Sequence, residues 1–144
     1  MMGVIFSIIA GAAMSIQGVF NTRLSDKIGL YESNAFVQGT AFILSLIVML
    51  FMGNGSLKGI FDIGNKLYLL GGAIGIIITI TVMLGIKNLS PTVAISIILI
   101  SQLIVAALID RFGLFDSEKI TFHWSHYLGI AMMLGGVILF KLKS

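Results

Sequence analysis

Five long apolar runs, separated by short polar segments, constrain this chain more than any other feature of its sequence. Each run holds close to 20 mostly apolar residues, the length that an α-helix needs to cross the ~30 Å hydrocarbon core of a membrane. The strands of a membrane β-barrel would alternate polar and apolar residues, and these runs do not alternate. We therefore predict an all-α integral membrane protein, one transmembrane domain over residues 1–144 with five helices at about 3–22, 33–53, 67–86, 91–109 and 122–140.

The small number of charged residues agrees with a surface that is covered largely by lipid. Only 10% of the residues are charged, whereas soluble domains have about 25%. The nine Lys and Arg form no basic run, which argues against nucleic acid as a partner. The chain has no cysteine, and it shows no nucleophile elbow, phosphate loop or zinc-protease motif. We expect no enzymatic activity, no cofactor and no metal.

The positively charged residues favour neither orientation in the membrane. With five spans, the N-terminus and the second and fourth loops share one side and hold four Lys or Arg, while the other side holds five. Orientation normally follows an excess of these residues on the cytoplasmic side. We expect the chain to insert both ways and to pair with an inverted copy of itself, as an antiparallel dual-topology dimer with a ten-helix inverted-repeat architecture. The alternative is a fixed topology that one positively charged loop decides.

Amide side chains within the apolar runs mark the candidate binding site. Gln17 and Asn21, in the segment QGVFNTR, are four residues apart and therefore share one face of the first helix. Gln102 lies near the middle of the fourth run, and Ser96 precedes it. A polar group without a partner is costly in hydrocarbon. We expect Gln17, Asn21, Ser96 and Gln102 to line an aqueous cleft. Interhelical hydrogen bonding is the alternative, and it is the role that we expect for Gln38.

Ionisable residues occur only at the ends of the runs, so a proton-coupled exchanger with a central carboxylate is disfavoured. Arg23, Glu32 and Asp110 are candidates for an electrostatic or gating role. Arg23 is placed to attract an anionic solute, or it extends to the headgroups or pairs with an acid. His123 and His126 are best explained as part of an interfacial aromatic anchor.

Small residues recur at four-residue spacing, which lets transmembrane helices pack closely. Gly11 belongs to such a stripe in the first run, and Gly71, Gly75 and Thr79 form one in the third. Gly135 lies in the last run. We expect these glycines to serve helix packing, within one chain or across a dimer.

Three motifs resemble those of the bacterial YdcZ-like family, a long-uncharacterised group within the drug/metabolite transporter superfamily. They are IQGVFNTRL, GGAIG and the stretch ISQLIVAALIDRFGLF, and the similarity runs nearly end to end. The resemblance implies five-helix units that occur as antiparallel dimers, as paired heterodimers or as fused ten-helix proteins. It also implies a distant relation to small multidrug exporters and to EamA-type transporters. The small exporters carry a central glutamate in the first helix, which this chain lacks. The positions that match the family are Gln17, Asn21, Gln102, Asp110, Phe112 and Gly113.

Taken together, these features predict a secondary-active transporter in the bacterial cytoplasmic (inner) membrane. We expect an antiparallel homodimer that moves a small polar or anionic organic solute by alternating access. Its partners would be a second copy of the chain, membrane lipid and the solute, with no nucleic acid. Two alternatives are a dual-topology channel for a small ion and a membrane scaffold that transports nothing.

Overall fold

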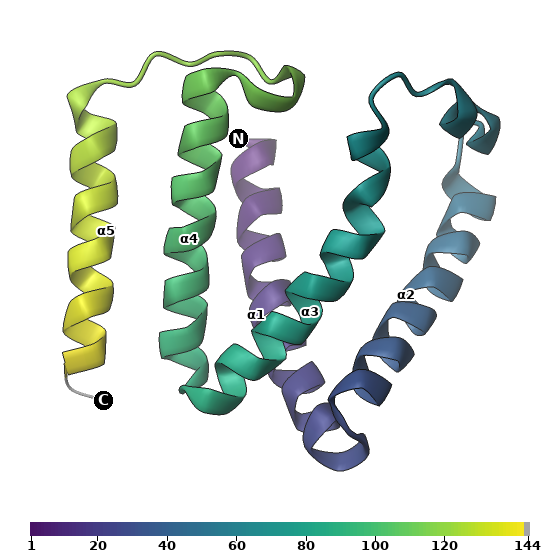
Figure 1. The fold of residues 1–144 in the computed structure, drawn as a ribbon, viewed down its shortest axis with the longest axis horizontal. Coiled ribbons are helices and arrows are strands. Elements are labelled where there is room, and N and C mark those ends of the chain that lie inside the picture. The colour runs from purple at the N-terminus through teal and green to yellow at the C-terminus, as the bar shows by residue number, and fades with distance from the viewer. Residues whose placement is uncertain (143–144) are drawn as a thin grey trace. The chain divides into compact units, whose positions relative to one another are not determined.

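The computed structural model describes residues 1–142, with side chains up to residue 139, as helices joined by short connections. The chain divides into two compact units, one of residues 1–87 and the other beginning at Asn88. The first unit contains α1 (Met2–Ile28), α2 (Leu30–Met52) and nearly all of α3 (Gly71–Asn88), and the second contains α4 (Pro91–Phe112) and α5 (Trp124–Leu142) (Figure 1). The predicted all-helical class is confirmed.

The turn between α1 and α2 consists of a single residue, Gly29, with a φ of 101°. A side chain is strained in this conformation, which glycine adopts readily. The predicted loop over residues 23–32 is therefore wrong. The apolar run ends near residue 22, but α1 continues as a 27-residue helix, about 40 Å long. Hydropathy marks the lipid-buried part of a helix and not the helix end.

Two short 3₁₀ helices connect α2 to α3: η1 (Leu57–Asp62) and η2 (Lys66–Leu70). The Ser56 and Asn65 side chains cap them by accepting backbone N–H groups. The α-helical part of the third run consequently begins at Gly71, four residues later than predicted.

The start of α4 is capped by residues that are close to it in sequence. Ser90 is the N-cap, and its Oγ accepts the N–H of Val93 at 3.4 Å, while Pro91 occupies the first helical position. At the other end Gly113 adopts a left-handed conformation, with a φ of 65°, and its N–H donates to the Ile109 carbonyl.

Within the second unit, α4 and α5 lie side by side and run in opposite directions (Figure 1). The 3₁₀ helix η3 (Leu114–Asp116) and an extended segment join them. This connection folds back on α4, because the Ile120 N–H donates to the Asp110 carbonyl at 2.9 Å. The Arg111 guanidinium lies 5.8 Å from the centre of the Tyr127 ring, a cation–π distance that joins the two helices.

Within the described residues, four helical segments are long and apolar enough to cross a membrane: α1, α2, residues 66–88 and α4. The described apolar part of α5, Trp124–Leu139, is shorter. Large apolar side chains cover the outside of these helices; Leu50, for example, is 77% exposed and Phe42 is 63% exposed. Buried positions in the first unit include the polar residues Asn21 and Ser33. This distribution is that of a membrane protein, in which apolar side chains face lipid.

Candidate functional site

The first unit packs around Gly18, in the second half of α1. A Cβ atom at this position would lie 2.9 Å from Ile86 Cδ1 and 3.1 Å from Val82 Cγ1, so these two α3 side chains occupy the space beside the bare backbone. Gly18 is not among the packing glycines predicted above. Its spacing could have indicated the role, because Gly18, Thr22 and Ser25 continue the stripe of small residues that contains Gly11.

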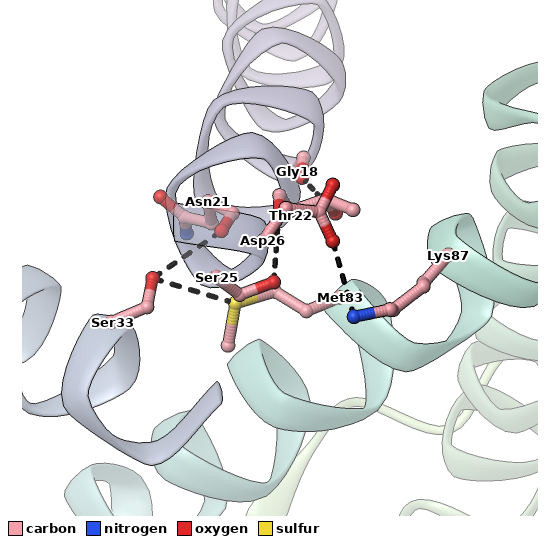
Figure 2. Close-up of polar contacts among 8 residues, drawn as sticks. All are labelled: Gly18, Asn21, Thr22, Ser25, Asp26, Ser33, Met83 and Lys87. Carbon is pink, nitrogen blue, oxygen red and sulfur yellow. Dashed lines mark hydrogen bonds and ion pairs between the residues drawn. The ribbon is translucent and has the colours of Figure 1, made fainter. Parts of the chain in front are cut away.

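Polar contacts join α1, α2 and α3 at one end of this unit (Figure 2). The Ser33 hydroxyl on α2 is fully buried; it donates to the Asn21 carbonyl at 3.3 Å and lies 3.8 Å from Met83 Sδ on α3. Thr22 and Ser25 donate to carbonyls of their own helix, each at 2.7 Å. These internal bonds satisfy the two hydroxyls, which allows them to be buried between helices.

An ion pair lies at the same end of the unit. Lys87 Nζ is 3.1 Å from Asp26 Oδ1, and the pair joins the last turn of α3 to that of α1 (Figure 2). Both side chains are partly exposed, so the pair contributes at most about 1 kcal/mol to stability. Its geometric effect is to hold the two helix ends together.

A small cavity lies between α1 and α3, beside the Gly18 contact. It has a volume of about 50 Å³, and we call it the α1–α3 cavity. Such a volume holds a few water-sized groups, whereas sites for organic ligands are typically 300–1,000 Å³. The residues that line it are Met14, Gln17, Gly18, Asn21, Ile78, Thr79 and Val82.

Both amides predicted on α1 therefore line one cavity. Asn21 is 7% exposed, yet its side-chain amide makes no hydrogen bond with any residue that the structure describes. Gln17, one turn earlier, is exposed in the single chain. The two amides thus offer donors and acceptors that the described part of the chain does not use.

Thr79, on α3, is the polar residue opposite these amides in the cavity lining. Its hydroxyl donates to the Gly75 carbonyl at 2.9 Å and accepts a hydrogen bond from Gln38 Nε2 at 3.3 Å. The predicted interhelical role of Gln38 is confirmed. Thr79 was predicted only as part of a packing stripe, because nothing in the sequence shows that α2 and α1 bring amides to this part of α3.

Asn34, one turn before Gln38 on the same face of α2, carries an unsatisfied acceptor. The residue is 8% exposed, and its Oδ1 is buried without a hydrogen-bond partner among the described residues. Leaving such an oxygen unpaired costs about 1–3 kcal/mol.

Ser96 and Gln102, the other two predicted binding residues, lie on α4 in the second unit. Ser96 is partly buried, and its Oγ donates to the Thr92 carbonyl at 2.7 Å. Gln102 is exposed. A cleft that these residues share with Gln17 and Asn21 stays a prediction.

The predicted electrostatic residues occupy ordinary helix-end environments. Arg23 is exposed and forms no ion pair within residues 1–139. Glu32 lies in the first turn of α2, where the helix dipole favours a carboxylate. Asp110 is partly buried near the end of α4. Gating roles for these three residues stay predictions.

The predicted packing glycines differ in their surroundings. A Cβ at Gly75 would lie 3.8 Å from Gln38 Nε2, so Gly75 faces α2. A Cβ at Gly11, Gly71 or Gly135 would meet no atom of the described chain within 4 Å. Each of these three positions is therefore open within its own compact unit.

The two histidines shape the start of α5. His126 Nδ1 accepts the N–H of His123 at 3.1 Å, which caps the first turn of the helix. The ring centres of Phe122 and His126 are 4.9 Å apart, so His126 belongs to an aromatic cluster. Among the residues described, no three metal-ligand side chains lie close together.

Comparison with known proteins gives one result. The family model described as "Putative inner membrane exporter, YdcZ" matches residues 2–139. No curated protein and no solved structure matches the chain.

Proposed function

Because the chain belongs to the YdcZ family, we propose that it is a secondary-active transporter of a small polar organic solute. The transporter would work by alternating access, as an antiparallel homodimer in the bacterial inner membrane, with no covalent chemistry and no cofactor. In this proposal α5 is the fifth span. Its 19 residues extend about 28 Å, close to the thickness of the hydrocarbon core.

The observation that carries the proposal is the α1–α3 cavity. Two amides and a hydroxyl line it, although lipid-facing helices normally avoid polar groups that lack partners. At about 50 Å³ it is too small for an organic solute. A second, inverted chain would add its own amides and enlarge the space, so that each chain supplies half of one site.

The contacts of Ser33 and the Asp26–Lys87 ion pair, which we call the polar junction, would open and close one end of the site during alternating access. Ser33 and the Asp26–Lys87 pair hold α1, α2 and α3 together at one end of the first unit. In an antiparallel dimer the same junction of the partner lies at the opposite membrane face. If one junction opens while the other stays closed, the shared site faces one side of the membrane at a time.

The experiment is a thermal-shift screen of metabolites against the purified protein, followed by flux measurements in liposomes. A ligand that binds the native state raises its stability by mass action. We expect a hit to be transported by the wild type and not by Gln102→Leu, which should still form the dimer. Normal transport by Gln102→Leu would contradict the predicted cleft that Gln102 shares with Gln17 and Asn21, and a flux far above ~10³ per second per dimer would indicate a channel. The absence of any flux would indicate a scaffold.

A further inference from the structure

We infer that Thr79 is a substrate-binding residue and that, with Gln17 and Asn21, it binds an uncharged hydrogen-bonding group of the solute, such as a primary carboxamide. The inference rests on the proposed function, since it concerns the cavity that would form half of the transport site. It narrows the solute from polar compounds in general to those that present an uncharged donor–acceptor group to this cavity.

The hydrogen-bonding capacity of the cavity is the first argument. The Thr79 proton is used by the Gly75 carbonyl, and one lone pair is used by Gln38. A hydroxyl oxygen has two lone pairs, so Thr79 keeps one acceptor position. The Asn21 residue is 7% exposed, and its amide makes no hydrogen bond with the described residues. Gln17, which is exposed in the single chain, adds a second amide to the cavity lining.

The free donors and acceptors of these three residues match an amide group better than an ion. A carboxamide both donates and accepts, as the cavity does. A carboxylate only accepts and would leave the free lone pair of Thr79 facing an anion. An alkylammonium only donates and would leave the amide N–H groups without an acceptor. A ligand that satisfies all three residues therefore carries donor and acceptor side by side.

The distribution of charge is the second argument. No charged side chain lines the cavity. Arg23 is two residues from Asn21, which places it about 200° around the helix and on another face. Asp26 and Lys87 are paired with each other. An ion in the cavity would thus lose its water without gaining a counter-charge, which is strongly unfavourable.

Three small probes of matched length test the inference: butyramide, butyrate and butylammonium. Each is titrated against the purified full-length protein in lipid nanodiscs, and the rise of the unfolding temperature gives an apparent Kd. We expect butyramide to bind at least tenfold more tightly than either ion. Thr79→Val, which keeps the side-chain shape, should weaken butyramide binding about tenfold, the value of one hydrogen bond.

Thr81→Val is the matched control. Thr81 lies on the same helix and its hydroxyl makes the same kind of internal bond, to the Ile77 carbonyl at 2.8 Å, but it does not line the cavity. This variant should bind butyramide like the wild type.

Three results would overturn the inference: no stabilisation by butyramide, equal or tighter binding of either ion, or the same affinity in Thr79→Val as in Thr81→Val. The proposed function fails separately. If butyramide binds selectively but liposomes show no flux of any solute, the transport proposal is wrong. The inference that the cavity binds an uncharged hydrogen-bonding group would still hold.

Discussion

Lys87 lies 3.1 Å from Asp26, so the only charged contact between α1 and α3 within the described chain joins the ends of both helices. Near this pair, Ser33 on α2 contacts Asn21 on α1 and Met83 on α3. Gly18 and Val82, which meet between α1 and α3, also line the cavity with the two amides. The α1 and α3 residues that would bind the solute are therefore close to those that would close the site.

Reversal of the ion pair should affect transport more than stability. Because both side chains are partly exposed, we expect Asp26→Lys or Lys87→Asp to lower the free energy of unfolding by less than about 1 kcal/mol. Each single reversal places like charges together and should slow liposome flux severalfold. The double reversal should restore it. Flux losses that simply add in the double variant would show that the two residues act independently.

Gly18→Leu should disrupt the fold of the first unit. The new side chain would overlap Ile86 and Val82, and overpacking of this kind costs about 1–3 kcal/mol. Thermal unfolding of the purified protein measures the loss. Gly39→Leu is the matched control, since a Cβ at Gly39 would meet no atom within 4 Å. An unfolding temperature for Gly18→Leu equal to that of the control would mean that α3 does not pack there.

Gly11→Leu tests the dimer instead. If a second copy packs against this open face, the added side chain should weaken dimerisation while the chain keeps its helices. Single-molecule photobleaching in nanodiscs counts chains per particle, and we expect a shift from two towards one. An unchanged count would place the interface on another face.

Asn34→Leu should stabilise the conformation described here and slow transport. The substitution removes a buried oxygen that has no partner, which should raise the unfolding temperature. If Asn34 forms a hydrogen bond with water or solute when the polar junction opens, Asn34→Leu removes that bond from the open state and the flux falls. Higher stability with undiminished flux would mean that Asn34 has no part in opening.

Most of the helices could be predicted from the sequence, because a helix that is exposed to lipid needs a long run of apolar residues. The cap at Ser90 and Pro91 was predictable for a similar reason, since capping depends on residues close in sequence. The single-residue turn at Gly29 was not, because α1 continues to Ile28 after its apolar run has ended, so the loss of hydropathy does not mark the end of the helix.

The site was predictable only in part. Gln17 and Asn21 share a face through the helical repeat alone, so their common cavity follows from spacing. Gly18 and Thr79 acquire their roles from α3 and α2 residues far along the chain. Periodicity shows which residues share a face, but it does not show which helix covers that face.

The most direct test of the antiparallel dimer is the orientation of single chains in intact cells. The native chain has no cysteine, so Gly55→Cys, in the exposed connection before η1, introduces one label site. A membrane-impermeant maleimide is applied before and after permeabilisation, and the labelled fractions are compared. Dual topology predicts that about half of the molecules react before permeabilisation and the rest after it. Labelling of all molecules, or of none, before permeabilisation would show a fixed orientation and contradict the antiparallel homodimer.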